Sequence, residues 1–364
     1  MPGLAARFSR QVILPGFGEE AQRRLSAARV LVIGAGGLGS TVIPAIAAAG
    51  IGTIGIIDDD TVELSNLHRQ HIHGIADVGR SKARSAAESV AAITPETRVV
   101  VLEARLSNHN ALELFADYDL VLDGSDNFPT RYLANDAAAL TGIPLVWGAV
   151  SQYGGQAGVA WAARGTQYRD LFPTPPPPGS VLSCEVGGVL PTVCATIGSI
   201  MATEAIKILT GIGTPLLGRV TTFDALSGTF RELSYERDPE AAPIEKLIDY
   251  ELFCGIAPVD DEIGPEDLAT ELEAGVPLTL LDVREPWETR IASLPGAVLI
   301  PLDALESSID SLDAGAAIVV YCHHGIRSAR ALELLKDRGF GNARHLQGGI
   351  DAWSRLVDPT VTRY

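Results

Sequence analysis

The stretch ARVLVIGAGGLGSTVIPAIAAAG, residues 28–50, decides how the first part of this chain folds. Its short apolar run predicts a buried strand, and the apolar spacing after the glycines predicts a helix. Between the two, Gly34, Gly36 and Gly39 form G-x-G-x-x-G, and Gly37 lies inside that motif. Glycines allow a tight turn, and the helix N-terminus offers N–H groups to a phosphate. We therefore expect an α/β fold that binds a nucleotide at this loop.

A second apolar strand ends on Asp58, 24 residues after Gly34, where a carboxylate can bind a ribose hydroxyl. Asn66, Arg69 and Lys82 follow it. A nicotinamide cofactor has only a diphosphate, which the glycine loop already binds, whereas added cations suit a triphosphate whose pyrophosphate leaves. This set favours ATP. The alternatives are a nicotinamide-dependent oxidoreductase and two cations that are merely solvated.

The segment DLVLDGSDN predicts an apolar strand that ends near two carboxylates, Asp123 and Asp126. A carboxylate at the C-terminal end of a strand, beside phosphates, suits Mg²⁺. We predict that Asp126 is a magnesium ligand.

Five motifs together carry a resemblance: RFSRQVILPGFG, GAGGLGS, DDDTVELSNLHRQ, GRSKA and DGSDNFPTRYLAND. From about Arg7 to Leu233 the chain resembles the adenylating domain of the ubiquitin-activating-enzyme-like family, in the branch that activates sulfur-carrier proteins. The resemblance implies a Rossmann-like domain with a mixed sheet over residues 1–245. It assigns the binding of ATP and magnesium to Gly34, Gly36, Gly37, Gly39, Asp58, Ser65, Asn66, Arg69, Lys82, Asp126 and Asn127.

Two further expectations come from this resemblance. The residue that matches Arg10 reaches into the partner subunit's nucleotide site, which implies a homodimer. The proline-rich run YRDLFPTPPPPGSVLSC would, by composition, be a stiff linker. The resemblance instead makes it part of a crossover loop, residues 165–190, in which Cys184 has the position of a cysteine that this loop carries in the family. Cys184 is then either a sulfur-handling thiol or a small buried side chain.

Relatives in this family often bind zinc through two C-x-x-C pairs, and this chain departs from that pattern. Gln167 and Asp170 stand where the first pair would be, and RDPEAAPIEK, where the second would fall, has no cysteine. We therefore expect no zinc site. Cys194 and Cys254 are expected to be structural.

Composition shifts over residues 246–263, which we interpret as a connector to a small α/β domain at 264–364. In YCHHGIRSARAL a strand ends on a cysteine, and the loop after it runs into a helix. Backbone N–H groups of such a loop and the helix dipole stabilise a thiolate. We predict a nucleophile and its loop at Cys322, His323, His324, Gly325, Ile326 and Arg327.

The segments DVREP, PGA, YCHHGIRSA and LQGGIDAW resemble a rhodanese domain, which implies that Cys322 carries sulfur as a persulfide. One alternative is a phosphatase, but its loop is one residue longer. Another is a metal site at Cys322, His323 and His324, although adjacent side chains rarely converge on one ion. Ser293 stands where relatives usually carry histidine, which affects the expected substrate contacts.

The net charge of −17 and the pI near 4.8 argue against a nucleic-acid or anionic-membrane surface. The N-terminal residues lack the apolar core of a signal peptide, and the most apolar window is broken by Pro44. The four cysteines are widely spaced. These features predict a cytoplasmic protein that binds neither nucleic acid nor membrane.

Together the two resemblances imply an enzyme that adenylates the C-terminal glycine of a ubiquitin-like sulfur-carrier protein ending in Gly-Gly and then forms a thiocarboxylate. The sulfur donor would be a cysteine desulfurase or thiosulfate. A carrier-docking scaffold without turnover is the remaining alternative. The pathway stays open among molybdopterin, thiamin, tRNA thiolation and secondary metabolism.

Overall fold

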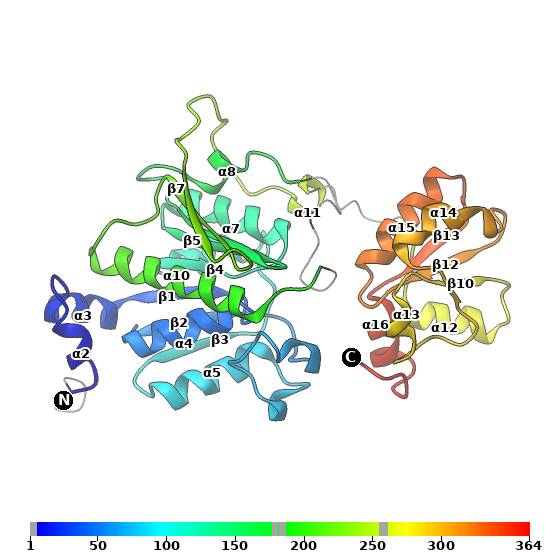
Figure 1. Ribbon diagram of the computed structural model, residues 1–364, viewed down its shortest axis with the longest axis horizontal. Helices are drawn as coiled ribbons and strands as arrows, with labels where there is room; N and C mark the ends of the chain where they lie inside the picture. Colours follow the sequence, from blue (N-terminus) through cyan, green and yellow to red (C-terminus); the bar gives the residue numbers. More distant parts are fainter. Residues whose placement is uncertain (1–5, 177–180, 182–186, 255–260) are drawn as a thin grey trace. The chain divides into compact units, whose positions relative to one another are not determined.

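A computed structural model describes residues 6–176, 181, 187–254 and 261–364 (Figure 1). The chain forms two compact units, Met1–Ile256 and Ala257–Tyr364. The first contains a large mixed sheet and the second a small parallel sheet, both with helices packed on them. This confirms the predicted α/β class, with a mixed-sheet domain followed by a smaller one.

The sheet of the first unit has the strand order β3-β2-β1-β4-β5-β6-β7-β8. Strands β3 to β5 are parallel, and β6, β7 and β8 continue the sheet in antiparallel pairs. The strands are β1 (Arg29–Ile33), β2 (Thr53–Ile57), β3 (Arg98–Leu102), β4 (Leu120–Asp123), β5 (Leu145–Ser151), β6 (Gly154–Ala160), β7 (Arg219–Asp224) and β8 (Thr229–Ser234).

Helices connect and cover these strands. They are α2 (Ser9–Val12), α3 (Gly18–Ala27), α4 (Gly39–Ala49), α5 (Lys82–Ile93), α6 (Ala111–Ala116), α7 (Phe128–Thr141), α8 (Tyr168–Leu171), α10 (Pro191–Thr210) and α11 (Tyr250–Phe253), with the 3₁₀ turns η1 (Leu64–Asn66) and η2 (Ile75–Asp77).

Strand β1 shows why the sheet has helices on both faces. Its residues after Arg29 are apolar in succession, and Val30 and Val32 enter one buried cluster while Leu31 and Ile33 enter another. A strand that is buried on both sides reads as a continuous apolar run, as the sequence does here. The first cluster includes side chains of α3, α4, α5 and α10, and the second includes those of α6, α7, α8 and α11.

Helix α10 is the one helix of the described residues with the length and hydropathy of a membrane span. It packs against α4 and strands β5 and β6, and its residues Val193, Ile197 and Met201 are wholly buried in the first cluster. Its apolar composition is therefore explained by its place in the core of this unit.

The second unit has a five-stranded parallel sheet in the order β11-β10-β12-β13-β9. Buried clusters lie on both faces of it. Its elements are β9 (Glu262–Ile263), α12 (Pro265–Glu273), β10 (Thr279–Asp282), α13 (Pro286–Thr289), β11 (Val298–Leu299), α14 (Leu302–Ser308), η3 (Ile309–Ser311), β12 (Ile318–Tyr321), α15 (Ile326–Asp337), β13 (Ala343–Leu346) and α16 (Gly349–Leu356).

The start of the predicted connector is packed on the first unit. Tyr250 and Cys254, from α11 and its end, are buried in the second cluster of that unit. The Tyr250 hydroxyl donates a 2.7 Å hydrogen bond to Asp136 Oδ2 in α7. Residues 247–254 are therefore an ordered part of the first unit.

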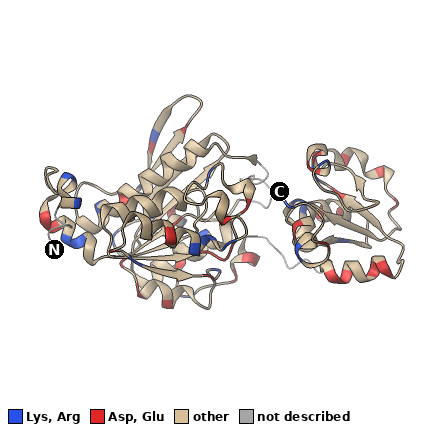
Figure 2. Ribbon diagram, turned by 90° about the horizontal axis from the view of Figure 1, so that it is seen from below, with Lys and Arg blue, Asp and Glu red and all other residues tan. Residues whose placement is uncertain are grey.

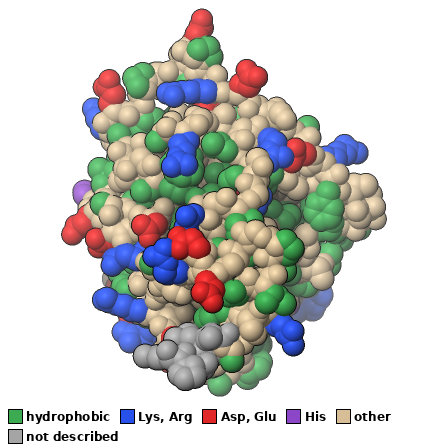
Figure 3. All heavy atoms as spheres, turned by 90° about the vertical axis from the view of Figure 1, so that its left-hand side faces the viewer, with side chains coloured by type: hydrophobic (Ala, Val, Ile, Leu, Met, Phe, Trp, Pro, Cys, Tyr) green, Lys and Arg blue, Asp and Glu red, His purple; other side chains and the backbone are tan. Residues whose placement is uncertain are grey.

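Charged residues occur in both units, and the acidic residues are not confined to one segment (Figure 2). On the face seen in Figure 3, basic and acidic side chains stand next to one another with apolar ones between them.

Candidate active sites

The glycine loop connects β1 to α4 and lies beside the end of β2. A Cβ on Gly39 would stand 2.1 Å from the carbonyl oxygen of Gly34, so only glycine allows this turn. Ile33 pairs with Ile57, and the two strands therefore end side by side. The next residue, Asp58, accepts a 2.7 Å hydrogen bond from the N–H of Ala35 inside the loop. The predicted phosphate loop and ribose carboxylate are thus in direct contact.

Lys82 is the first residue of α5, and its side chain is only 9% exposed. Its Nζ lies 2.7 Å from Oδ2 of Asp60. Burial acts to lower the pKa of Lys82, but the charges of Asp60 and Asp58 outweigh it and raise that pKa. The ammonium of Lys82 therefore stays charged.

Burial is also the main influence on Asp58. It raises the pKa of this carboxyl, while the charge of Lys82 and the hydrogen bond from Ala35 act in the opposite direction.

Asn66 and Arg69 come from the η1 turn and the residues after it. Asn66 is buried, and its Oδ1 accepts a 3.2 Å hydrogen bond from the N–H of Glu63. Arg69 Nη1 donates a 3.2 Å hydrogen bond to the carbonyl of Ser65. The Arg69 Cδ would lie 3.8 Å from a Cβ on Gly37, which puts this cation next to the glycine loop.

Strand β4 pairs with β1 on the side opposite to β2, and carboxylates lie at its end. Asp123 is wholly buried; its Oδ1 accepts a 2.9 Å hydrogen bond from the N–H of Ser125, and its Oδ2 has no partner among the described residues. Burial raises the pKa of Asp123. Asp126 is exposed, and its charge acts on Lys82. Asn127 caps α7, because its Oδ1 accepts a 2.9 Å hydrogen bond from Thr130.

Two predicted residues remain, Arg10 and Cys184. Arg10 lies on α2 and is exposed. Cys184 falls outside the described residues. Of the other cysteines, Cys194 is buried in α10 against the glycine loop, where a Cβ on Gly37 would lie 3.0 Å from its sulfur. Cys254 is buried, and burial raises the pKa of its thiol to about 11.

In the second unit, Cys322 follows β12, and α15 begins four residues later. The Cys322 side chain is buried, and its Sγ accepts a 3.2 Å hydrogen bond from the N–H of Gly325. The start of α16 contacts the backbone of this loop. Ile350 donates to the Cys322 carbonyl at 2.9 Å, and a Cβ on Gly349 would lie 2.4 Å from that oxygen.

Arg327 closes the predicted loop and is paired with a residue from α13. Its two terminal nitrogens each donate a 2.6 Å hydrogen bond to Glu288. Burial acts to lower the pKa of Arg327, but the hydrogen bond and charge of Glu288 raise it. Ile326 is exposed, and so is Ser293, the residue that replaces the usual histidine.

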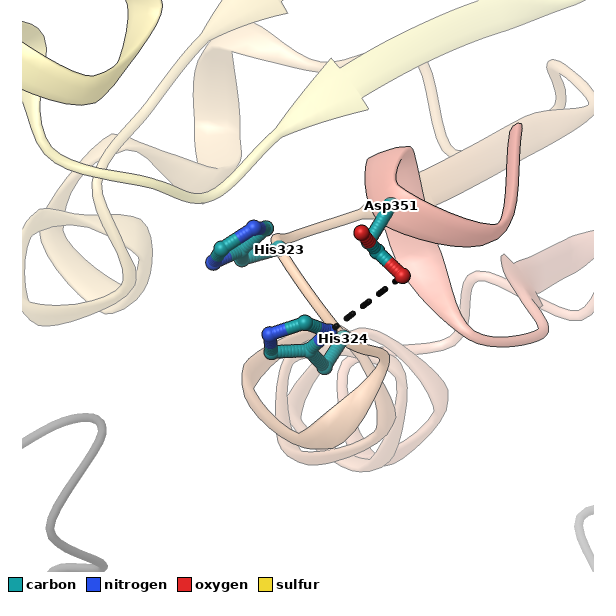
Figure 4. Close-up of side chains that lie close together, drawn as sticks. All are labelled: His323, His324 and Asp351. Atoms are coloured by element: carbon teal, nitrogen blue, oxygen red, sulfur yellow. Dashed lines mark ion pairs between the residues drawn. The ribbon is translucent and has the colours of Figure 1, made fainter. Parts of the chain in front are cut away.

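His323 and His324 stack on one another beside Asp351 (Figure 4). Their ring centroids are 3.9 Å apart with 25° between the planes, and His324 Nδ1 lies 4.0 Å from Asp351. Three such groups could hold a metal ion. Because the two rings are stacked, their nitrogen lone pairs lie in nearly parallel planes and do not converge on one point. Asp351 is already paired with Arg355. We therefore assign no metal to this cluster.

The model of the ThiF family matches residues 8–243, and that of the Rhodanese-like domain matches residues 264–356. The chain belongs to the ThiF family. The predicted ThiF-type adenylating domain with a following rhodanese domain is confirmed, and so is an enzyme of the adenylyltransferase and sulfurtransferase type.

Three relatives show how far the likeness extends. The chain is 50% identical to the probable adenylyltransferase/sulfurtransferase MoeZ of Mycobacterium tuberculosis, over 99% of this chain and 95% of that protein. It is 40% identical to the adenylyltransferase and sulfurtransferase MOCS3-1 of Zea mays, over 98% of this chain and 83% of that protein. The sulfur carrier protein adenylyltransferase of Thermus thermophilus is 49% identical over 69% of this chain and 96% of its own length.

Among solved structures, E. coli MccB with ATP matches the chain with a TM-score of 0.58 at 20% identity, over 65% of this chain and 73% of that one. At this identity the match shows a shared fold.

Sequence reasoning missed several residues of both sites. In the nucleotide site, no sequence signal singled out Asp60 or His73. His73 is buried, and its Nε2 lies 3.0 Å from the carbonyl of Ala35 while Nδ1 lies 2.8 Å from Ser85 Oγ. In the rhodanese domain, Glu288 was missed. Charge and spacing alone do not single out such partners, because they become neighbours only in the fold.

Proposed function

We propose that this enzyme uses ATP to adenylate the C-terminal glycine of a ubiquitin-like sulfur-carrier protein and then converts that carboxylate to a thiocarboxylate. The observation that carries the proposal is the hydrogen bond between the glycine loop and Asp58, together with the charged Lys82 that pairs with Asp60 and is stabilised by the charge of Asp58, in the same chain as the Cys322 loop. The first set suits a triphosphate, and the second suits a nucleophilic sulfur.

In the adenylation step, a carboxylate oxygen of the carrier attacks the α-phosphorus of ATP, and pyrophosphate leaves. The glycine loop, with Gly34, Gly36, Gly37 and Gly39, binds phosphate through backbone N–H groups. Asp58 binds the ribose. Ser65, Asn66 and Asn127 complete the nucleotide contacts. Arg69 and Lys82 stabilise the negative charge that develops on the phosphates.

Magnesium fits the end of β4, because the groups there are carboxylate oxygens and Asp123 Oδ2 is buried without a partner among the described residues. Asp126 would hold the ion, with Asp123 behind it. When bound, Mg²⁺ neutralises charge on the ATP phosphates. No zinc is proposed, because Gln167 and Asp170 replace the first cysteine pair.

In the sulfur-transfer step, the Cys322 thiolate first accepts a sulfur atom from the donor and becomes a persulfide. The outer sulfur attacks the acyl carbon of the adenylate, AMP leaves, and an acyl disulfide forms. A thiolate then attacks the Cys322 sulfur and releases the carrier as a thiocarboxylate, and the disulfide that remains is reduced by an external thiol. Cys184 is our candidate for the attacking thiolate.

The persulfide loop consists of His323, His324, Gly325, Ile326 and Arg327. The N–H of Gly325 already reaches the Cys322 sulfur, and Arg327 adds positive charge near it. We propose thiosulfate or a cysteine desulfurase as the sulfur donor.

We propose a cytoplasmic homodimer in which Arg10 of one protomer reaches the nucleotide site of its partner, since this cation is exposed on α2. The relatives named MoeZ and MOCS3 support molybdenum cofactor biosynthesis as the pathway.

The test is ATP–pyrophosphate exchange with and without a carrier that ends in a free glycine. We expect exchange only with the carrier, and loss of exchange in Asp126→Ala, with the exposed Asp117→Ala as control. Carrier-independent binding of a nicotinamide cofactor would favour the oxidoreductase instead. Carrier binding without exchange would favour the scaffold.

A further inference from the structure

The residues after α16 fold back toward the Cys322 loop. Ser354 Oγ donates a 2.7 Å hydrogen bond to the carbonyl of Val361, whose side chain packs on a buried cluster of the rhodanese domain. Arg363 Nε donates to Asp351 Oδ1 at 2.7 Å. These contacts hold the segment on α16, so the position of Tyr364 is set by several anchoring groups.

The hydroxyl of Tyr364 connects two ion pairs. It accepts a 2.7 Å hydrogen bond from Arg284 Nη1 and donates a 3.0 Å bond to Glu288 Oε1. Arg284 is wholly buried and is bonded to Asp282 through Nε at 2.9 Å and Nη2 at 2.5 Å. Burial raises the pKa of Tyr364, so the hydroxyl keeps the proton that it donates to Glu288.

Glu288 passes this connection to the Cys322 loop, because the same carboxylate accepts both hydrogen bonds of Arg327. The hydroxyl therefore lies in one continuous polar chain that ends at the loop: Asp282, Arg284, Tyr364, Glu288 and Arg327. Without the Tyr364 hydroxyl, Glu288 loses one hydrogen-bond donor, and the negative charge of Glu288 next to Arg327 is less neutralised.

The ring of Tyr364 contacts the loop by a second route. It stacks on His323 with 4.2 Å between centroids and 8° between planes, and His323 stacks on His324 in turn. Burial and the charge of His324 lower the pKa of His323 to about 4, so the His323 ring that stacks on Tyr364 is uncharged at neutral pH. These two histidines are the residues between Cys322 and Gly325, whose N–H reaches the sulfur.

We propose that Tyr364 is a positioning residue for the Cys322 loop: its hydroxyl orients Arg327 through Glu288, and its ring fixes His323 and His324. The inference rests on the proposed persulfide role of Cys322. The hydroxyl is expected to act on the binding of an anionic donor, since Arg327 is the cation of the loop. The ring is expected to act on turnover, since it fixes the backbone that holds the sulfur.

The experiment measures thiosulfate:cyanide sulfurtransferase activity of the full-length protein. The Cys322 thiolate takes the outer sulfur of thiosulfate and sulfite leaves; cyanide then takes that sulfur as thiocyanate. We expect Tyr364→Phe, which keeps the ring, to raise KM for thiosulfate about fivefold with kcat within about twofold, the size of one hydrogen bond. Tyr364→Leu should lower kcat by at least about tenfold. The exposed neighbour Thr362→Ala is the matched control and should behave as the parent protein.

The outcomes separate this inference from the function on which it rests. Cys322→Ala with retained activity would remove the persulfide role itself. An inactive Cys322→Ala together with an unchanged KM in Tyr364→Phe would overturn the positioning role alone. Should Tyr364→Leu unfold the domain, the KM of Tyr364→Phe still decides, and pyrophosphate exchange should be unchanged in every variant.

Discussion

Lys82 Nζ lies 2.7 Å from Asp60 Oδ2 at the start of α5, and this pair keeps a buried cation charged before any phosphate arrives. The Asp60 side chain is 67% exposed, so it can give way to a phosphate, whereas Lys82 is held by its helix. Under the proposed function, Asp60 would occupy the place next to Lys82 that a phosphate of ATP takes.

We predict that Lys82→Ala lowers the rate of carrier-dependent pyrophosphate exchange by about 100-fold or more, the usual effect of removing one charged group from a phosphoryl-type transition state. Arg84→Ala is the control, because Arg84 lies on the same helix, is largely exposed and pairs with Glu103. Equal rates in the two variants would contradict the role of Lys82.

His73 gives a second prediction for the same site. Its ring holds the Ala35 carbonyl, and Asp58 holds the Ala35 N–H. Burial lowers the pKa of His73, so the ring is neutral and donates through Nε2 while Nδ1 accepts from Ser85. His73→Phe should raise KM for ATP about tenfold by loosening the glycine loop. Exchange kinetics at varied ATP test this, and Ser85→Ala should show a smaller effect in the same direction.

Much of the fold could be predicted because its signals are local. The apolar run of β1, the glycines after it and the helical spacing of α4 lie within one short stretch, and they decide the strand–loop–helix unit. Asp58 could be placed because parallel strands β1 and β2 end at the same sheet edge. The loop from Cys322 to Arg327 is likewise continuous in sequence.

The partners of these residues could not be predicted in the same way. Glu288 meets Arg327 across 39 positions, and Tyr364 meets Glu288 across 76. Such contacts depend on how the whole domain packs, and one acidic residue among 45 carries no local sign of its role.

The positions of the missing zinc pairs give a third prediction. Asp170 Oδ1 accepts a 3.3 Å hydrogen bond from the N–H of Asp238, which joins the segments where the two cysteine pairs would be. Nearby, the buried Asp136 pairs with Arg169 and accepts from Tyr250. We expect less than about 0.1 zinc per chain by elemental analysis, since neither of these two segments of the sequence contains a cysteine. One zinc per chain would contradict this.

The same network predicts a stability effect. Asp136→Ala leaves the Arg169 charge without its partner in a largely buried place, which should cost about 3 to 5 kcal/mol in the free energy of unfolding of the first unit. Tyr250→Phe removes one hydrogen bond and should cost about 1 kcal/mol. Chelator treatment should leave the melting temperature of the parent protein unchanged. Denaturant unfolding of each variant measures these differences.

The lowered pKa of His323 gives a pH prediction for the rhodanese domain. Between pH 4 and 6.5 the unfolded state binds a proton that the folded state does not, so stability is full above pH 6.5 and falls as pH falls toward 4. The shift from 6.5 to about 4 corresponds to about 3 kcal/mol. Asp351 and Glu288 oppose the shift, and His324 adds to it. Hydrogen exchange of β12 peptides at pH 7 and 4.5 should show this loss in the parent protein, and a smaller loss in His323→Gln.

The last prediction separates the two chemistries by cysteine. Cys322→Ala removes the sulfur that Gly325 holds, so thiosulfate sulfurtransferase activity and thiocarboxylate formation should both be abolished. Pyrophosphate exchange should be unchanged, because Asp58, Lys82 and the glycine loop lie in the other unit. Cys184→Ala should also keep exchange, and it should lower the yield of thiocarboxylate if its thiol releases the carrier. Sulfurtransferase activity, pyrophosphate exchange and thiocarboxylate yield are measured on each variant, and the thiocarboxylate is measured by the mass of the carrier. Loss of exchange in Cys322→Ala would show that the two steps depend on each other, and retained sulfurtransferase activity there would assign the persulfide to another residue.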